Sequence, residues 1–135
     1  MPGLWSYRLE ITDYASKEVK KFRPPAPAFY AMVSYAGNLA TVPALIDTGA
    51  DFSVIPHKVA VLLGLRQFSE KEVIGSMGDS QTRPVFKADL TFLDSSISNQ
   101  SLVSLERRIH MLIGRDILNQ YKTVFDGPNL QFNFE

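Results

Sequence analysis

The most informative stretch of the chain is ALIDTGADFSVIP, at residues 44–56. Its apolar beginning is typical of a buried strand, and that strand ends abruptly in Asp47, Thr48 and Gly49. A carboxylate at the edge of a core is unfavourable unless it is hydrogen-bonded or has a chemical use. The local alternative is a tight turn, which Asp47 opens and in which Gly49 supplies a backbone conformation closed to other residues. The tripeptide alone is compatible with both interpretations.

A second stretch, LIGRDIL at residues 112–118, has a similar organisation. Its apolar strand stops at Gly114, and the charged pair Arg115 and Asp116 follows at the start of a predicted short helix. Two apolar strands that both break near a glycine indicate that two chain segments pass beside each other at one site. This juxtaposition favours the functional interpretation of Asp47.

Strand patterns dominate the rest of the chain. We predict strands at residues 4–11, 29–35, 39–46, 72–74, 84–92, 102–105, 109–113, 123–125 and 130–134, helices at 58–63 and 116–121, and a surface loop at 94–100. Pro56 and Gly64 mark the two ends of the first helix. The glycine-rich residues 75–80 form the predicted flexible tip of a long hairpin. This pattern predicts a mainly β fold of barrel type.

The first 28 residues differ in character from the remainder. The charged run at residues 17–21 is typical of a solvated turn or face. Three prolines within residues 22–28 exclude a helix interior or a central strand and predict a stiff connector. We therefore expect a single domain in which an N-terminal strand and connector, residues 1–28, precede a main body at residues 29–135.

The composition is that of one globular domain of 135 residues, with 45% hydrophobic and 21% charged residues. Fourteen basic and fourteen acidic residues leave no net charge to attract nucleic acid over long range. The absence of cysteine excludes disulfides, thiolate catalysis and cysteine-ligated zinc. Because neither a signal peptide nor a membrane-spanning apolar run is recognisable, we expect a cytoplasmic protein without nucleic-acid or membrane partners.

These residues together resemble the retropepsin-like aspartic proteases. The resemblance rests on the segment at residues 45–50, on Ile-Gly-Arg-Asp at residues 113–116, on the glycine-rich hairpin between them and on a closing strand. It runs from about Phe29 to the C-terminus. It implies a closed barrel with a flap hairpin and one or two short helices. It also implies a homodimer, because each chain of the family supplies one catalytic aspartate and this sequence has one Asp-Thr-Gly.

The resemblance further implies roles for individual residues. Asp47 corresponds to the catalytic acid and base, Thr48 to the hydroxyl residue that bonds across the dimer, and Gly49 to the position whose backbone faces the substrate. Ala50 and Asp51 correspond to residues of the substrate groove.

Other positions are assigned in the same way. Arg115 is expected to form a structural ion pair with Asp51. The flap tip and the groove are expected to contact substrate through Gly75, Ser76, Met77, Gly78 and Ile113. Apolar residues near the site indicate a preference for hydrophobic substrate residues: Phe52, Val54, Met77 and Ile113.

The chemistry of such a site needs only carboxylates and water. Two carboxylates within hydrogen-bonding distance share one proton, because both cannot ionise without a large electrostatic penalty. The ionised member then takes a proton from water while the protonated member donates to the scissile carbonyl. The sequence thus predicts an aspartic endopeptidase for extended peptides or unfolded proteins, with no metal or cofactor. His57 and His110 lack the spacing of metal ligands and are predicted to be structural or exposed.

Two alternatives remain open at this level. The same fold can serve as a catalytically silent module that binds peptides or dimerises. The N-terminal residues 4–11 can cover the barrel, pair at a new interface or lie near the groove as an inhibitory strand, and residues 130–135 can interleave with a second chain as in the viral enzymes.

Overall fold

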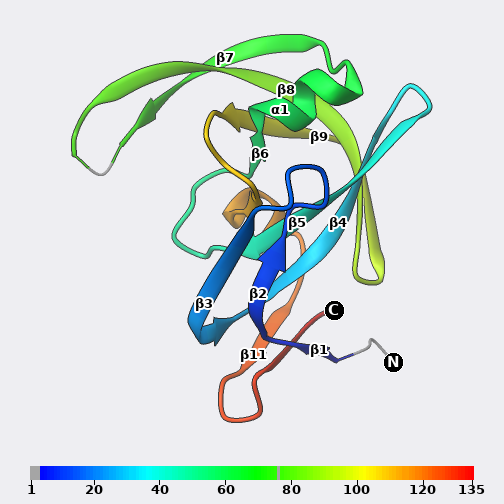
Figure 1. Cartoon of the computed structure of the whole chain (residues 1–135), viewed down its shortest axis with the longest axis vertical. Helices are drawn as coiled ribbons and strands as arrows, with labels where there is room; N and C mark the ends of the chain where they lie inside the picture. The colour runs from blue at the N-terminus through cyan, green and yellow to red at the C-terminus, as the bar shows by residue number, and fades with distance from the viewer. Residues whose placement is uncertain (1–3, 76) are drawn as a thin grey trace.

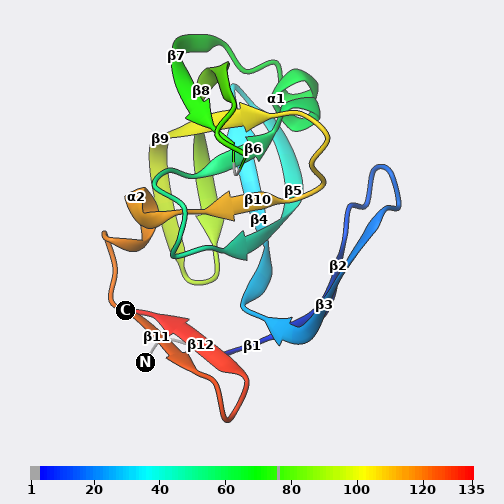
Figure 2. The same ribbon diagram turned by 90° about the vertical axis from the view of Figure 1, so that its left-hand side faces the viewer.

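The structure is a computed structural model that describes residues 4–75 and 77–135. Within these residues the main sheet closes into a six-stranded barrel, which runs through β4 (Ala28–Tyr35), β5 (Asn38–Ile46), β10 (Met111–Ile113), β6 (Val54–Pro56), β9 (Ser95–Leu105) and β8 (Ser80–Phe92). Strand β8 pairs with β4, with Leu90 opposite Val33, and so closes the ring. The prediction of a mainly β closed barrel is confirmed (Figures 1 and 2).

Aromatic and aliphatic side chains fill the interior of this barrel. Phe29 stacks on Phe92 with ring centroids 5.8 Å apart, and Phe92 meets Phe134 edge to face at 5.6 Å. Leu102 of β9 and Ile113 of β10 are completely buried. Because Phe134 belongs to the last strand, the C-terminal segment contributes to the same core as the barrel.

The described residues contain two short helices, α1 (His57–Leu63) and α2 (Arg115–Leu118). Helix α1 follows Pro56 and ends at Gly64, which adopts a φ of +67° that favours glycine. The proline and glycine signals therefore marked this helix correctly. Helix α2 is shorter than the predicted 116–121, because the bonds that follow it are those of tight turns, such as Tyr121 N–H to Leu118 O at 3.1 Å.

The flap-like hairpin consists of β7 (Gln67–Ile74) and the outer part of β8. Figure 1 shows it projecting from the barrel. Strand β7 begins five residues before the predicted 72–74. Its side chains are exposed on nearly every position, so the alternation of apolar and polar residues that marks a half-buried strand is missing.

Two further boundaries differ from the predictions. The predicted surface loop at 94–100 belongs largely to β9, where Ile97 pairs with Leu90 of β8. Ile97 packs against the core, whereas the serine and asparagine side chains around it are partly or fully exposed, which explains the polar composition. The strand predicted at 109–113 is confined to β10, because the chain still turns at Arg107, which has a φ of +60°.

The N-terminal segment forms β1 (Trp5–Ser6), β2 (Arg8–Thr12) and β3 (Val19–Ala26). The predicted strand at 4–11 is thus divided, and the proline-rich segment is a strand rather than a connector. Prolines are tolerated there because β2 and β3 form a two-stranded sheet in which each strand has a free edge. The charged run at 17–21 is exposed, as predicted. The division of the chain at residue 28 stays a prediction.

The β2–β3 hairpin packs on the outside of the barrel. Ile11 and Phe22 are buried against Tyr30 and Leu45 of β4 and β5. The Tyr30 hydroxyl accepts a hydrogen bond from the Thr12 backbone N–H at 3.0 Å. Asp13 forms an ion pair with Lys58 of α1. The N-terminal segment therefore covers part of the barrel.

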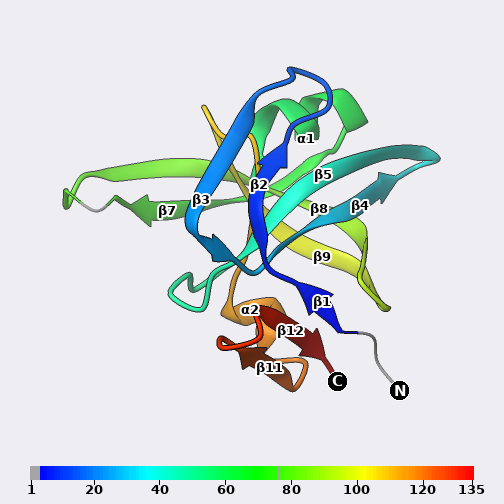
Figure 3. The ribbon, with the colours of Figure 1, turned by 60° about the horizontal axis from the view of Figure 1, so that its bottom comes forward.

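A second, three-stranded sheet joins the two ends of the chain in the order β1, β12 (Gln131–Phe134) and β11 (Thr123–Asp126). Strands β1, β12 and β11 lie together near the two ends of the chain (Figure 3). Trp5 lies opposite Phe132, and Phe132 lies opposite Phe125. Both edges of β12 are thus occupied by strands of its own chain. This arrangement differs from the interleaving considered for residues 130–135.

No helix among residues 4–75 and 77–135 combines the length and the apolar character required to cross a bilayer.

Candidate active site

The segment that carries Asp47 follows directly from β5, at the point where β5 and β10 run side by side. These strands are parallel, and Ile46 lies opposite Ile113. The Asp47 backbone N–H donates to Ile113 O at 3.0 Å, immediately before the chain reaches Gly114. On its other side β10 pairs with β6, to which the chain returns after the Asp47 segment (Figure 2). The two stretches singled out in the sequence therefore meet at one place.

Asp47 is half-buried and its carboxylate is held by its own loop. Its Oδ1 accepts the backbone N–H of Gly49 at 2.9 Å, and its carbonyl oxygen accepts that of Ala50 at 3.1 Å. A Cβ added at Gly49 would lie 3.2 Å from Asp47 Oδ1. Glycine therefore lets the backbone approach the carboxylate closely while leaving its second oxygen, Oδ2, outside this hydrogen bond.

The loop at residues 47–53 is fixed from inside by contacts that we call the inner brace, formed by Ser53, Gly114 and Asp116. Ser53 is completely buried, and its hydroxyl donates to Asp116 Oδ1 at 2.7 Å while accepting the Gly114 N–H at 2.9 Å. Asp116 Oδ2 also accepts the Ser53 N–H at 3.0 Å. A Cβ at Gly114 would meet backbone atoms of Phe52 at 2.7 Å, so no larger residue fits there.

The same loop is held from outside by the outer brace, formed by Arg115 with Thr48 and Asp51. The Arg115 guanidinium donates through Nη1 to Thr48 O at 2.7 Å and forms an ion pair through Nη2 with Asp51. The expected pairing of Asp51 with Arg115 is thus present. The two side chains are 76% and 44% exposed, so solvent screens their attraction. The outer brace therefore orients the loop more than it stabilises the fold.

The tip of the flap is a tight turn. Gly75 N–H donates to Asp79 O at 2.8 Å, and Gly78 N–H donates to Gly75 O at 3.0 Å. Gly78 has a φ of +83°, which explains the glycine. Met77 is 91% exposed, and Ser76, also predicted as a flap-tip residue, lies outside the described residues.

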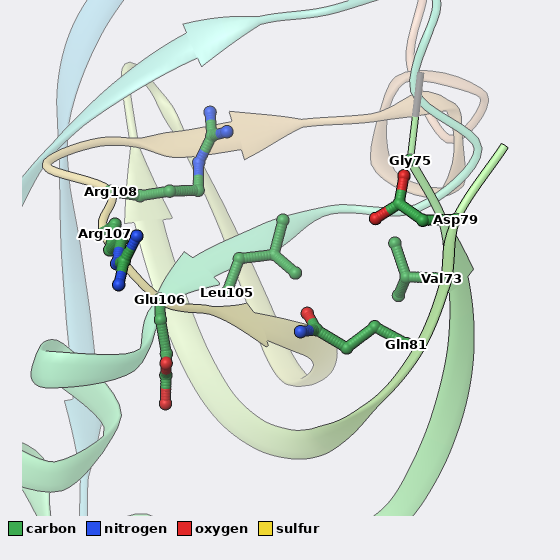
Figure 4. A pocket seen from close by; sticks show the side chains of 8 residues that line it. All are labelled: Val73, Gly75, Asp79, Gln81, Leu105, Glu106, Arg107 and Arg108. Atoms are coloured by element: carbon green, nitrogen blue, oxygen red, sulfur yellow. The ribbon is translucent and has the colours of Figure 1, made fainter. Parts of the chain in front are cut away.

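Two adjoining hollows lie beside the flap, one against the 105–108 turn and one against the Asp47 loop, and we call them together the groove. The flap hollow is lined by Val73, Gly75, Asp79, Gln81 and residues 105–108, as Figure 4 shows. The loop hollow is lined by residues 49–52, Val54, residues 71–74, Leu105 and Leu112. The hollows are neighbours, because Val73 and Leu105 line both.

The groove contains several of the predicted site residues. Gly49, Ala50 and Asp51 line the loop hollow, and Gly75 lines the flap hollow. Ile113 is completely buried in the barrel core, so its side chain does not line the groove, whereas the preceding Leu112 does. This difference follows from the alternation of side chains along β10.

Arg108 lines the flap hollow and contacts His110, and neither residue was expected to belong to the site. Arg108 Nη2 lies 3.2 Å from His110 Nε2. Burial lowers the pKa of Arg108, and the negative charge of Asp47 opposes that shift. Burial, together with the positive charges of Arg108 and Lys20, lowers the pKa of His110 to about 4. His110 is therefore neutral at pH 7. No periodic signal in the sequence separates these residues from ordinary turn residues.

Other functional groups lie away from the groove or are scattered. His57 Nδ1 is 3.1 Å from the Ser104 hydroxyl, in contact with the buried end of β9. In the part of the chain that the structure describes, no three His, Asp or Glu side chains form a group that fits a metal ion.

The barrel, the flap and the Asp-Thr-Gly loop define a retropepsin-like aspartyl protease. A family model described as aspartyl protease matches residues 31–117, more than half of the chain, and the chain therefore belongs to that family. A comparison with curated protein sequences gives no match.

Solved structures share this fold at low sequence identity. A retropepsin-like aspartic protease from Rickettsia conorii is 16% identical with a TM-score of 0.65, over 98% of this chain and 90% of that chain. The EIAV protease, in complex with the inhibitor HBY-793, is 20% identical with a TM-score of 0.58, over 70% of this chain and 86% of that chain. The likeness to the Rickettsia protein includes the N-terminal segment, which lies outside the resemblance seen in the sequence.

Proposed function

We propose that the protein is an aspartic endopeptidase that hydrolyses peptide bonds with water activated between two Asp47 side chains, one from each protomer of a homodimer. The observation that carries the proposal is the position of Asp47, half-buried beside the groove, with Oδ1 held by Gly49 and only one Asp-Thr-Gly in the chain. One carboxylate cannot act as both acid and base in the same step. A second copy supplies the missing group.

The chemistry follows from the proximity of the two carboxylates. The pair holds one proton, because two negative charges in contact are unfavourable. The ionised Asp47 removes a proton from water, which attacks the scissile carbonyl carbon, while the protonated Asp47 donates its proton to the carbonyl oxygen. Collapse of the resulting tetrahedral species breaks the C–N bond and releases the amine, which takes up a proton. Thr48 bonds across the dimer and keeps the two loops in register, and the backbone of Gly49 faces the substrate.

An extended peptide is the ligand that suits the groove. The flap and the Asp47 loop border it, and glycines from both, Gly75 and Gly49, let a peptide backbone approach closely. A peptide in extended conformation can pair with a sheet edge as an added strand, and β7 has one edge without a partner among the described residues. The exposed Met77 and the half-buried Leu112 add apolar contacts at the tip and floor.

The three-stranded terminal sheet is the surface that we propose for dimerisation. Apolar side chains remain at least 40% exposed on or beside it: Leu4, Val124, Phe125 and Leu130. In the described residues, β1 and β11 each have one edge without a partner strand. Pairing with a second copy would cover these edges and apolar groups. The cytoplasmic location stays a prediction of the sequence.

The test is a mixing experiment with Asp47→Asn, in which an amide replaces the carboxylate with little change in shape. The variant alone should lose peptidase activity on an unfolded protein substrate while sedimenting with the same mass as the wild type. Adding an excess of the variant to a fixed amount of wild-type chain should reduce the activity, because mixed dimers contain one carboxylate. Activity that stays proportional to wild-type chain, or a protein that is monomeric while active, would contradict the proposal.

A second experiment distinguishes the proposed enzyme from a catalytically silent module that only binds peptides. An enzyme binds a statine-type mimic of the tetrahedral species far more tightly than the corresponding plain peptide. Equal affinities, together with no cleavage between pH 4 and 7, would support the module instead.

A further inference from the structure

Arg108 places a positive charge in the flap hollow without an acidic partner. Its side chain lines the hollow together with Val73 and Gly75 of the flap (Figure 4). Among the described residues no carboxylate forms an ion pair with it, and its Nε is buried without a hydrogen-bond partner. A partly buried guanidinium in this condition lacks the anion that would offset its desolvation.

The neighbouring His110 does not supply that anion. Because arginine can only donate, Arg108 Nη2 donates to His110 Nε2, and the ring proton therefore lies on Nδ1. His110 Nδ1 is itself buried without a partner among the residues described. Neutral His110 and cationic Arg108 are thus hydrogen-bonded to each other, and each still has an N–H group without an acceptor among the described residues.

The acids that border the hollow form no ion pair with Arg108. Glu106 lies 3.8 Å from Arg83 Nη1, on the other side of the 105–108 turn. Asp79 lies against the flap tip, where its Oδ1 would be 2.5 Å from a Cβ on Gly75. Asp47 acts on Arg108 only through its field, and in the proposed dimer each Asp47 carries half of one negative charge on average.

We propose that Arg108 is a specificity-determining residue that binds the carboxylate of an aspartate or glutamate side chain of the substrate peptide. The inference rests on the proposed function, because the ligand is a peptide lying in the groove. Arg108 Nη1 forms no hydrogen bond within the described chain, so it is available to an incoming oxygen. Guanidinium groups hold carboxylates through charge-assisted, directional hydrogen bonds. The apolar groove then provides affinity, and the acidic side chain selects the register of the peptide.

The test measures binding rather than turnover. The full-length Asp47→Asn protein is titrated with labelled extended peptides that are acetylated and amidated at their ends, so that they carry no terminal charge. A single glutamate is moved through the peptide, and each peptide is compared with its glutamine counterpart. At one position we expect the glutamate peptide to bind about tenfold more tightly, as a charged hydrogen bond in a partly buried site allows.

Variants then assign this preference to a residue. Arg108→Gln should reduce the ratio of glutamate to glutamine affinity to about one. Arg108→Lys keeps the charge without the planar geometry and should give an intermediate ratio, which also covers the case in which Arg108→Gln does not fold. The matched control is Arg66→Gln, which removes the same charge from an exposed arginine that lines neither hollow and should leave the ratio unchanged.

The outcomes separate this inference from the proposed function. A ratio of one at every position, or a ratio that survives both Arg108 variants, overturns the inference even where the wild-type enzyme cleaves peptides. An Arg108-dependent ratio in a protein that cleaves nothing supports the inference and contradicts the endopeptidase.

Discussion

The inner and outer braces hold the same loop from its two sides, but they differ in burial. The inner brace joins Ser53, Gly114 and Asp116 through hydrogen bonds in the protein interior. The outer brace contains an ion pair between Arg115 and Asp51, and this pair lies on the surface. Buried hydrogen bonds are costly to break because the released groups cannot reach water, whereas exposed ion pairs exchange with solvent. The comparison predicts that stability depends on the inner brace.

The largest effect is expected for Gly114→Ala. The added methyl group would overlap backbone atoms of Phe52 at 2.7 Å, and backbone cannot move aside as a flexible side chain can. We expect a loss of about 3 kcal/mol in the free energy of unfolding, measured by urea denaturation. Gly127→Ala is the matched control, because no atom lies within 4 Å of its added Cβ. Equal stabilities of the two variants would contradict the packing argument.

A smaller loss is expected for Ser53→Ala. The substitution removes the hydroxyl that links Asp116 to Gly114, and both are then left without one buried partner. The expected loss is about 2 kcal/mol, again from urea denaturation. Ser98→Ala, at an exposed position of β9, should change stability very little. A result in which the two serine variants are equivalent would show that the inner brace is not needed for stability.

The third effect depends on pH and concerns His110, which is intermediate in burial. Its pKa of about 4 lies below its unfolded value, so the unfolded chain binds the proton first as pH falls. Stability is therefore fully present above about pH 6.5 and should fall from there toward pH 4. Denaturation midpoints across this range should fall more steeply for wild type than for His110→Gln. Parallel curves for the two proteins would exclude His110 as the cause.

Asp13 does not interfere in that range of pH. Burial raises the pKa of its carboxyl, but the hydrogen bonds from Lys58 and Ser16 and the charge of Lys58 outweigh it, and the net shift is downward. Stability from a lowered carboxyl pKa is present above the unfolded pKa and is lost as pH falls through the folded one. That loss lies below the window used for His110.

The smallest effect is expected for Asp51→Asn. The substitution removes the ion pair of the outer brace, while Arg115 keeps its hydrogen bond to Thr48 O. The expected change in unfolding free energy is at most about 0.5 kcal/mol, measured in low and high salt. A loss as large as that of Ser53→Ala would reverse the comparison between the two braces.

The sequence predicted the meeting of the Asp47 and Gly114 segments because both lie at breaks in apolar strands. It also predicted the helix between Pro56 and Gly64, where local chemistry determines the outcome. It predicted only the end of β7, at 72–74, and it predicted a loop where the first half of β9 lies. Nearly every side chain of β7 is exposed, and Ile97 is the only apolar residue among residues 95–100, so neither segment carries the apolar alternation of a half-buried strand.

The candidate site was predictable to a similar extent. Asp47 and its neighbours belong to one contiguous motif, whereas the groove combines distant segments. Leu112 and Ile113 differ in role only by the side of β10 to which each points, which the sequence alone does not determine. Arg108 lies in an irregular turn, and its lack of an acidic partner depends on where the side chains of Glu106 and Asp79 point. Such information exists only after the chain has folded.

The pairing of β1 with β12 has a consequence for the order of folding. Trp5 and Phe132 are partners, although nearly the whole chain separates them. On the ribosome, β1 is made before the barrel strands and β12 after them, so this sheet can form only once the barrel strands have been synthesised. Contacts at such sequence separation require most of the intervening chain to be organised beforehand. The surface proposed for pairing two chains is therefore completed after the barrel strands, which delays association until the barrel exists.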